Sequence, residues 1–183
     1  MSIIKYLVVG SALPAAVTSM VYIKTVSNEQ VKATARREGF SSKPIIPVKG
    51  DVPTIGYGTT IYPDGRRVKM TDPAISRGMA FEYLKQHITK DGRIFNTSIR
   101  NIPISQKEYD VYMDFTYQYG VGTWLKSSML HNLKLRKYKK ACASLLKYKY
   151  VAGYDCSTPG NNRCLGVWTE QIKRYDNCMS AQK

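Results

Sequence analysis

The sequence predicts a mainly helical α+β protein, in which a small β-hairpin lobe precedes a larger helical lobe. Pro and Gly residues are frequent between residues 39 and 65, where short alternating stretches are typical of strands joined by turns. After residue 74, apolar residues recur at the spacing of a helix face, and polar or Gly-rich breaks separate the successive runs. A cleft between two such lobes is a common place for a polymer to bind.

Composition fits one globular domain with a strong positive charge. The chain has 183 residues, of which 43% are hydrophobic and 22% are charged, and its 28 Lys+Arg against 13 Asp+Glu give a net charge of +15. Such a field attracts polyanions, and nucleic acid, anionic lipid and an anionic cell-wall polymer all fit the charge. No nucleic-acid recognition motif accompanies the charge, so we expect no nucleic-acid partner, and we expect a monomer.

The N-terminal segment is apolar over residues 6–23, which contain no charged residue. A bilayer core requires about 20 apolar residues in helical form, so this length is borderline. Small and hydroxylated residues dilute its Leu, Ile and Val content. A cleaved signal peptide, a permanent anchor and a weak anchor that later leaves the bilayer all remain open, and the weak anchor fits the composition best. A buried core helix is disfavoured by Pro14. We therefore expect an anchor-like segment at 1–26, export, and a folded domain at 27–183.

The first predicted helix begins at a Ser-Asn pair at 27–28, which is suited to cap it, and runs to Glu38. Gly39 is a typical residue at which a helix ends. Beyond it, alternating residues predict two strands and a turn, at residues 54–58, 59–62 and 63–65. These segments form the predicted β lobe.

The helical lobe is predicted from periodicity and capping signals. Pro73 lies where the first turn of a second helix would begin, with helical periodicity continuing to about residue 98. Ser105 and Glu108 form a capping box that opens a long central helix, which stops at Gly120. Three further helices are predicted, at about 127–134, 138–148 and 167–179. Trp124 and Trp168 are expected in the core.

All four cysteines lie in the last quarter of the chain, which suggests disulfides in an exported protein. Three pairings are possible. Cys156 and Cys164 flank a turn-rich loop that closes easily, which leaves Cys142 to pair with Cys178 and tie two helices together. A four-thiolate zinc site and free buried thiols are the alternatives, although the spacing matches no zinc pattern.

Two carboxyl groups and a threonine form the candidate catalytic site. Glu38 ends an apolar-faced helix, whereas Asp51 and Thr54 lie beside a Gly-rich turn. Cleavage of a glycosidic bond requires a protonated acid for the leaving oxygen and a carboxylate to support the positive transition state. Partial burial would keep Glu38 protonated, a solvated Asp51 would serve as the carboxylate, and the Thr54 hydroxyl could hold a water. The spacing alone is a weak signal, because such trios occur often by chance.

Ordered motifs over about residues 29–178 resemble the bacteriophage lysozymes of glycoside hydrolase family 24. The resemblance rests on Glu38-Gly39, on Val-Pro-Thr-Ile-Gly-Tyr-Gly at 52–58 and on Thr60. It continues through the central helix and its Gly-Val-Gly-Thr-Trp turn at 120–124, and through the Cys-flanked segment at 156–171. The resemblance implies a lysozyme-like fold in which a Glu is the general acid, an Asp and a Thr complete a triad, and neither metal nor cofactor is needed.

The chain departs from the family pattern at three points. The family usually places its Asp six residues before the Thr, where this chain has Val48, so Asp51 is the nearest candidate for that role. The family's His after Gly-Tyr-Gly is Thr59 here, and its usual Asn in the central helix is Gln118. Tyr57, beside the triad, and Gln118 are the candidate substrate-binding residues. The two histidines, His87 and His131, match no catalytic motif and receive no role.

The resemblance implies a phage endolysin that hydrolyses the β-1,4 bond between N-acetylmuramic acid and N-acetylglucosamine in peptidoglycan, for host cell lysis. Two alternatives compete: a cationic protein that permeabilises membranes, and a lytic transglycosylase on the same scaffold. The N-terminal segment is similar in kind to the signal-anchor-release segments of some endolysins. That similarity implies a protein tethered to the inner membrane through residues 6–23 and later free in the periplasm.

Overall fold

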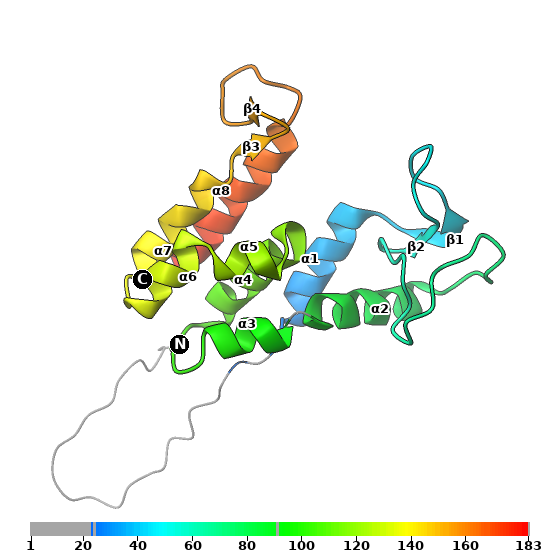
Figure 1. The fold of residues 1–183 in the computed structure, drawn as a ribbon, viewed down its shortest axis with the longest axis horizontal. Helices are drawn as coiled ribbons and strands as arrows, with labels where there is room; N and C mark the ends of the chain where they lie inside the picture. The colour runs from blue at the N-terminus through cyan, green and yellow to red at the C-terminus, as the bar shows by residue number, and fades with distance from the viewer. Residues whose placement is uncertain (1–22, 24, 91, 183) are drawn as a thin grey trace, which may run out of the picture.

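A computed structural model describes residues 23, 25–90 and 92–182, and Figure 1 shows its helices and strands. Apart from Ile23, the expected anchor at 6–23 lies outside the described residues. Across the part that is described, no helix combines the length and apolar character needed to cross a membrane. The elements follow in the order α1 (Asn28–Glu38), β1 (Ser41–Ile45), β2 (Thr54–Gly56), α2 (Arg77–Lys90), α3 (Gly92–Ser98), α4 (Gln106–Tyr119), α5 (Val121–Leu125), α6 (Ser128–Lys134), α7 (Tyr138–Ser144), the 3-10 turn η1 (Leu145–Lys147), β3 (Tyr150–Val151), β4 (Tyr154–Asp155) and α8 (Leu165–Ser180).

The β lobe is an antiparallel hairpin packed on α2. Ser41 lies opposite Gly56 and Ile45 opposite Thr54, with an irregularity between the two pairs. A small core fills this lobe, made of Ile55, Tyr62, Val68, Ile75 and Ala80. Gly56 has φ +66°, and a Cβ there would lie 2.9 Å from the Cβ of Ala80. Glycine therefore allows β2 to approach α2 closely.

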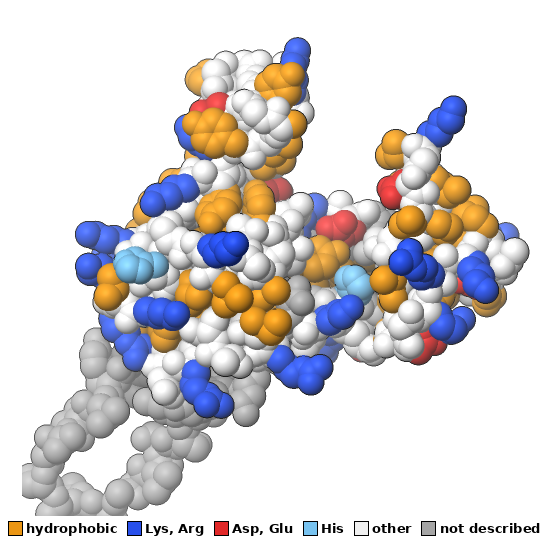
Figure 2. Space-filling view, in the orientation of Figure 1, with side chains coloured by type: hydrophobic (Ala, Val, Ile, Leu, Met, Phe, Trp, Pro, Cys, Tyr) orange, Lys and Arg blue, Asp and Glu red, His pale blue; other side chains and the backbone are white. Residues whose placement is uncertain are grey.

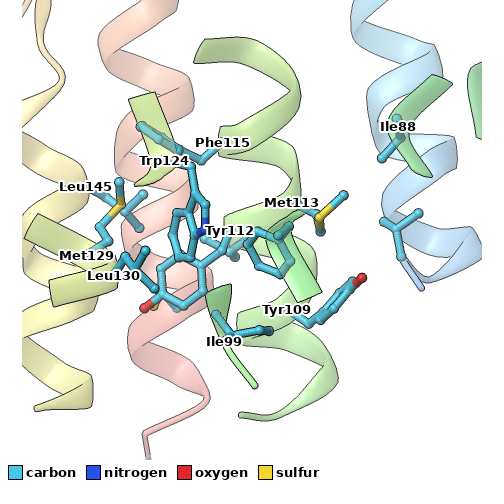
Figure 3. Packing of buried hydrophobic residues seen from close by; sticks show 14 of the residues in the cluster. Ile88, Ile99, Tyr109, Tyr112, Met113, Phe115, Trp124, Met129, Leu130 and Leu145 are labelled. Carbon is cyan, nitrogen blue, oxygen red and sulfur yellow. The ribbon is translucent and has the colours of Figure 1, made fainter. Parts of the chain in front are cut away.

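The helical lobe is built around α4. The predicted capping box is present, because the Ser105 hydroxyl accepts from the Glu108 amide while the Glu108 carboxylate accepts from the Ser105 amide. Figure 3 shows the rings and aliphatic side chains that pack on this helix. Trp124 is buried among them as predicted, and its Nε1 donates to Ser98 Oγ at 2.8 Å. Trp168 is only half-buried. The mainly helical α+β prediction is confirmed.

The segment between the lobes differs from the prediction. Residues 71–76 are not helical, and α2 begins at Arg77. The Asp72 carboxylate accepts from the Tyr62 hydroxyl and the Lys69 amide, and the Ile75 amide donates to Ser42 O at 2.8 Å. These bonds hold the segment to the β lobe. The region predicted as one helix up to about residue 98 forms two helices, α2 and α3. The strand predicted at residues 59–62 is absent although these residues are described, and they form only isolated β-bridges.

Both favoured disulfides are present. Cys142 and Cys178 join α7 to α8 with their Cα atoms 5.5 Å apart. Cys156 and Cys164 close the loop between β4 and α8, with a Cα–Cα distance of 5.1 Å. All four cysteines are described and none is free, so the zinc site and the free thiols are ruled out.

Candidate active site

A polar pocket of about 470 Å³ lies where the end of α1, the β lobe and the two helices α2 and α4 meet. Its lining residues are Glu38, Gly58, His87, Ile88, Lys90, Tyr117 and Gln118. Figure 2 shows that the surface is hollowed between the β lobe and the projecting β3–β4 hairpin. The pocket thus opens between two raised parts of the molecule, as a polymer-binding cleft requires.

Glu38 is the last residue of α1. The Ser27 hydroxyl caps the start of this helix by accepting from the Gln30 amide, and Gly39 with φ +74° ends it. A Cβ on Gly58 would lie 3.6 Å from Glu38 Oε2, so the β lobe approaches the carboxyl group closely. Although Glu38 is an exposed residue, desolvation raises its pKa, while Arg37 lowers it and Asp114 adds a smaller upward effect. A raised pKa favours the protonated form that a proton donor requires.

A buried ion cluster fixes the helix that carries Glu38. Asp114 on α4, with 4% of its side chain exposed, pairs with Arg37 of α1 at 2.7 Å and with Arg174 of α8 at 2.6 Å. Gln30 and Thr34 of α1 also donate to its Oδ1. Burial acts to raise the pKa of Asp114, but the two guanidinium groups outweigh burial and the pKa is lowered. Asp114 thus holds α1 against α4 and α8 as a carboxylate.

Asp51 and Thr54 lie on the β hairpin. Asp51 is exposed in the connection between β1 and β2, where its carboxylate accepts from the Val52 amide. Thr54 is the first residue of β2, and its hydroxyl donates to Val52 O at 3.1 Å. Both residues are described, yet neither lines the pocket around Glu38. The structure thus brings together Glu38 and Gln118 of the expected set, whereas Asp51 and Thr54 lie in the β lobe outside the pocket lining.

Tyr57 packs between the lobes. Its ring lies 5.3 Å from that of Phe40, and it contacts both apolar clusters. It does not line the pocket either, although it is described. The contacts that Tyr57 makes are those of a side chain that fixes the β lobe against the helical lobe.

Tyr117 and His87 are among the pocket residues for which the sequence predicted no role. Tyr117 precedes Gln118 on α4, and burial, followed by the charge of Glu38, raises its pKa to about 12. The sequence shows that Tyr117 is next to Gln118 on the predicted central helix, and it carries no further signal for a functional role. His87 also lines the pocket, from α2, and no sequence signal distinguished it from an exposed histidine.

Several phage lysozymes and endolysins are similar to this chain. Residues 35–163 match the family described as Phage lysozyme. The endolysin of Salmonella phage P22 is 28% identical over 130 residues, which cover 71% of this chain and 86% of that protein.

Two solved structures share the fold. A mutant P22 lysozyme superposes with a TM-score of 0.69 at 23% identity, over 86% of this chain and 99% of that one. An endolysin from Escherichia coli O157:H7 phage FAHEc1 has a TM-score of 0.68 at 22% identity, over 84% of this chain and 92% of that one. The lysozyme-like architecture is confirmed by these superpositions. Because the family match spans most of the chain and includes the residues around the pocket, this chain belongs to the phage lysozyme family.

Proposed function

We propose that the chain is an endolysin that cuts the β-1,4 bond between N-acetylmuramic acid and N-acetylglucosamine and so lyses a bacterial host. Membership of the phage lysozyme family makes it a peptidoglycan-hydrolysing glycosidase. The observation that carries the choice of active site is the placement of Glu38 in a polar pocket between the two lobes. Assignment to glycoside hydrolase family 24 is part of the proposal and is supported by the motifs at 52–58.

Glu38 is proposed as the general acid. Its raised pKa favours the protonated form that a general acid requires, and Gly58, which has no side chain, lies beside the carboxyl group. Tyr117 and Gln118 line the same pocket from α4, which supports a role in substrate contact. Substrate contact is proposed for Gln118, while the interlobe packing of Tyr57 supports an indirect role for that residue.

Asp51 and Thr54 are proposed to complete the site from the β lobe. Asp51 would supply the second carboxylate and Thr54 would position a water. The connection that carries Asp51 is exposed and lies outside the pocket lining, so this role requires the β hairpin to close over a bound glycan. The hairpin is anchored through Gly56 and Ile75, which gives such a closure a fixed base.

Residues 6–23 are proposed as a signal anchor that tethers the protein to the inner membrane before release to the periplasm. The described residues next to this segment are fastened to α4: the Ser27 amide donates to Asp110 Oδ1 at 2.8 Å, and Gln106 donates to Thr25 O. Because α1 runs directly from this point to Glu38, tethering would strain the acid. Fractionation tests the proposal: an intact product that moves from membrane to periplasm supports it, and a shortened soluble product contradicts it.

Mass spectrometry of the products released from purified sacculi tests the reaction. A muramidase leaves reducing N-acetylmuramic acid ends, whereas a lytic transglycosylase leaves 1,6-anhydro ends. Reducing ends are the expected result. Anhydro ends would replace the proposal by the transglycosylase alternative, and reducing N-acetylglucosamine ends would contradict the choice of bond.

A further inference from the structure

The β3–β4 hairpin presents exposed rings at the tip of a projection. Tyr150, Val151 and Tyr154 are 60%, 40% and 46% exposed. Figure 1 places this hairpin, residues 150–155, away from the body of the helical lobe, and Figure 2 shows hydrophobic and cationic side chains on it. We call these residues the tyrosine ribbon. Large exposed apolar side chains gathered on one element are typical of an interaction site.

The tyrosine ribbon is held in shape by several bonds. Ala152 and Gly153 both have positive φ, as a two-residue hairpin turn of type I′ requires. Lys149 pairs with Asp155 at 2.8 Å, and that bond, followed by the Ser157 hydroxyl, lowers the pKa of Asp155 to about 2. The Cys156–Cys164 disulfide closes the adjoining loop. Rigid tyrosines bind a partner with little loss of conformational entropy.

Cations lie against both rings. Lys149 Nζ is 5.3 Å from the centre of the Tyr150 ring, and Arg163 Cζ is 4.7 Å from that of Tyr154. Cation–π contacts of this kind fix ring orientation. They also place positive charge beside the apolar ring surface, which complements a ligand that combines apolar C–H faces with carboxylates.

The tyrosine ribbon is connected to the wall of the active-site pocket through aromatic contacts. Tyr148, two residues before Tyr150, has its ring 4.6 Å from Phe115 and 5.5 Å from Tyr119. Both partners belong to α4, and the same end of α4 supplies Tyr117 and Gln118 to the pocket. Tyr148, which leads into the ribbon, therefore packs on the helix that forms one wall of the cleft.

We propose that Tyr150 and Tyr154 form an accessory glycan-binding site, which stacks on N-acetylated sugars of a peptidoglycan strand beyond the bond held at Glu38. The inference rests on the proposed function, because it takes the strand in the cleft as its ligand. One face of a pyranose ring is lined with C–H groups and packs on an aromatic ring, while the stem-peptide carboxylates of peptidoglycan match the positive charge of Arg163 beside Tyr154.

The test measures binding apart from cleavage. The full chain carrying Glu38→Gln is incubated with washed, insoluble sacculi at physiological salt, and bound protein is quantified by sedimentation. We expect Tyr150→Ala and Tyr154→Ala to weaken binding by about tenfold each, and Phe at either position to retain it. Leu135→Ala, which removes an exposed side chain at the end of α6, is the matched control and should bind as the parent does.

A second arm uses the chain with Glu38 intact. The Ala variants should cleave a short soluble oligosaccharide as fast as the parent does, because the ribbon lies outside the pocket. Sacculus binding unchanged by both Ala variants would overturn the inference. The same variants are also sedimented with vesicles of anionic phospholipid, and a loss of binding to the vesicles alone would overturn it too. Failure of the unsubstituted chain to release muropeptides would instead refute the proposed function, so the two failures are distinguishable.

Discussion

Replacing Asp114 by Asn removes the charge that holds three helices together. The carboxylate joins Arg37 of α1 and Arg174 of α8, and the Arg174 side chain is only 6% exposed. Asparagine keeps the volume but leaves Arg174 without its counter-charge, and leaves Arg37 with only Glu170, at 3.6 Å. Breaking a buried ion pair by removing one partner costs about 3–5 kcal/mol. For a domain of this size we expect the unfolding temperature to fall by about 6–20 °C.

The pH dependence of stability distinguishes the effect of the Asp114 charge from the effect of its side-chain shape. The lowered pKa of Asp114 means that its stabilising effect is complete above the unfolded pKa of about 3.9 and is lost as pH falls through the lower folded value. The stability difference between the parent and Asp114→Asn should therefore be full at pH 7 and shrink below about pH 4.

Thermal and urea unfolding of both proteins from pH 2.5 to 7 measures this difference. Asp176→Asn, at an exposed position of α8, is the control and should change stability by less than about 0.5 kcal/mol. Two results would refute the reasoning: a decrease of less than about 1 kcal/mol in the free energy of unfolding for Asp114→Asn at pH 7, or a decrease that is as large in acid as at pH 7.

Three further outcomes follow from the site and the cross-links. Removing the Cys142–Cys178 disulfide, which spans 36 residues, should lower the free energy of unfolding by about 4 kcal/mol. Removing Cys156–Cys164, which spans 8, should lower it by about 2.5 kcal/mol, and equal losses measured by urea unfolding would contradict this order. Because desolvation raises the pKa of Glu38, the apparent pKa at which kcat/KM falls on the alkaline side should lie above the ordinary Glu value of about 4.3. An apparent pKa below that value in a pH–rate profile would contradict the assignment of Glu38 as the acid. Asp51→Asn should lower kcat by about 100-fold or more without changing the unfolding temperature, and unchanged kcat would remove Asp51 from the mechanism.

Local signals predicted the elements that local bonds determine. The capping box of Ser105 and Glu108 was readable because its two hydrogen bonds span three residues. The end of α1 at Glu38 was readable because Gly39 adopts a positive φ that favours glycine. The disulfides followed from a short, turn-rich loop. Apart from Cys142 and Cys178, which are 36 positions apart and were paired because the other two cysteines flank the loop, the deciding residues lie close in sequence.

Long-range contacts determined what the sequence did not show. The predicted helix start near Pro73 was wrong because Ile75 and Asp72 bond to the β lobe. The cluster around Asp114 joins residues 77 and 60 positions away, for which one sequence carries no signal. The position of Asp51 likewise depends on how the β1–β2 connection folds, and its catalytic role stays a prediction.

Glu38→Gln tests the central claim most directly. The measurement is the rate of muropeptide release from purified sacculi, together with clearing of cells whose outer membrane has been permeabilised. Loss of the proton donor should slow release by about 10²–10⁴-fold, while the unfolding temperature stays within about 2 °C because the side chain is exposed. Release at the parental rate would contradict Glu38 as the general acid. Cell killing that persisted without release and fell steeply with salt would instead support a membrane-permeabilising protein.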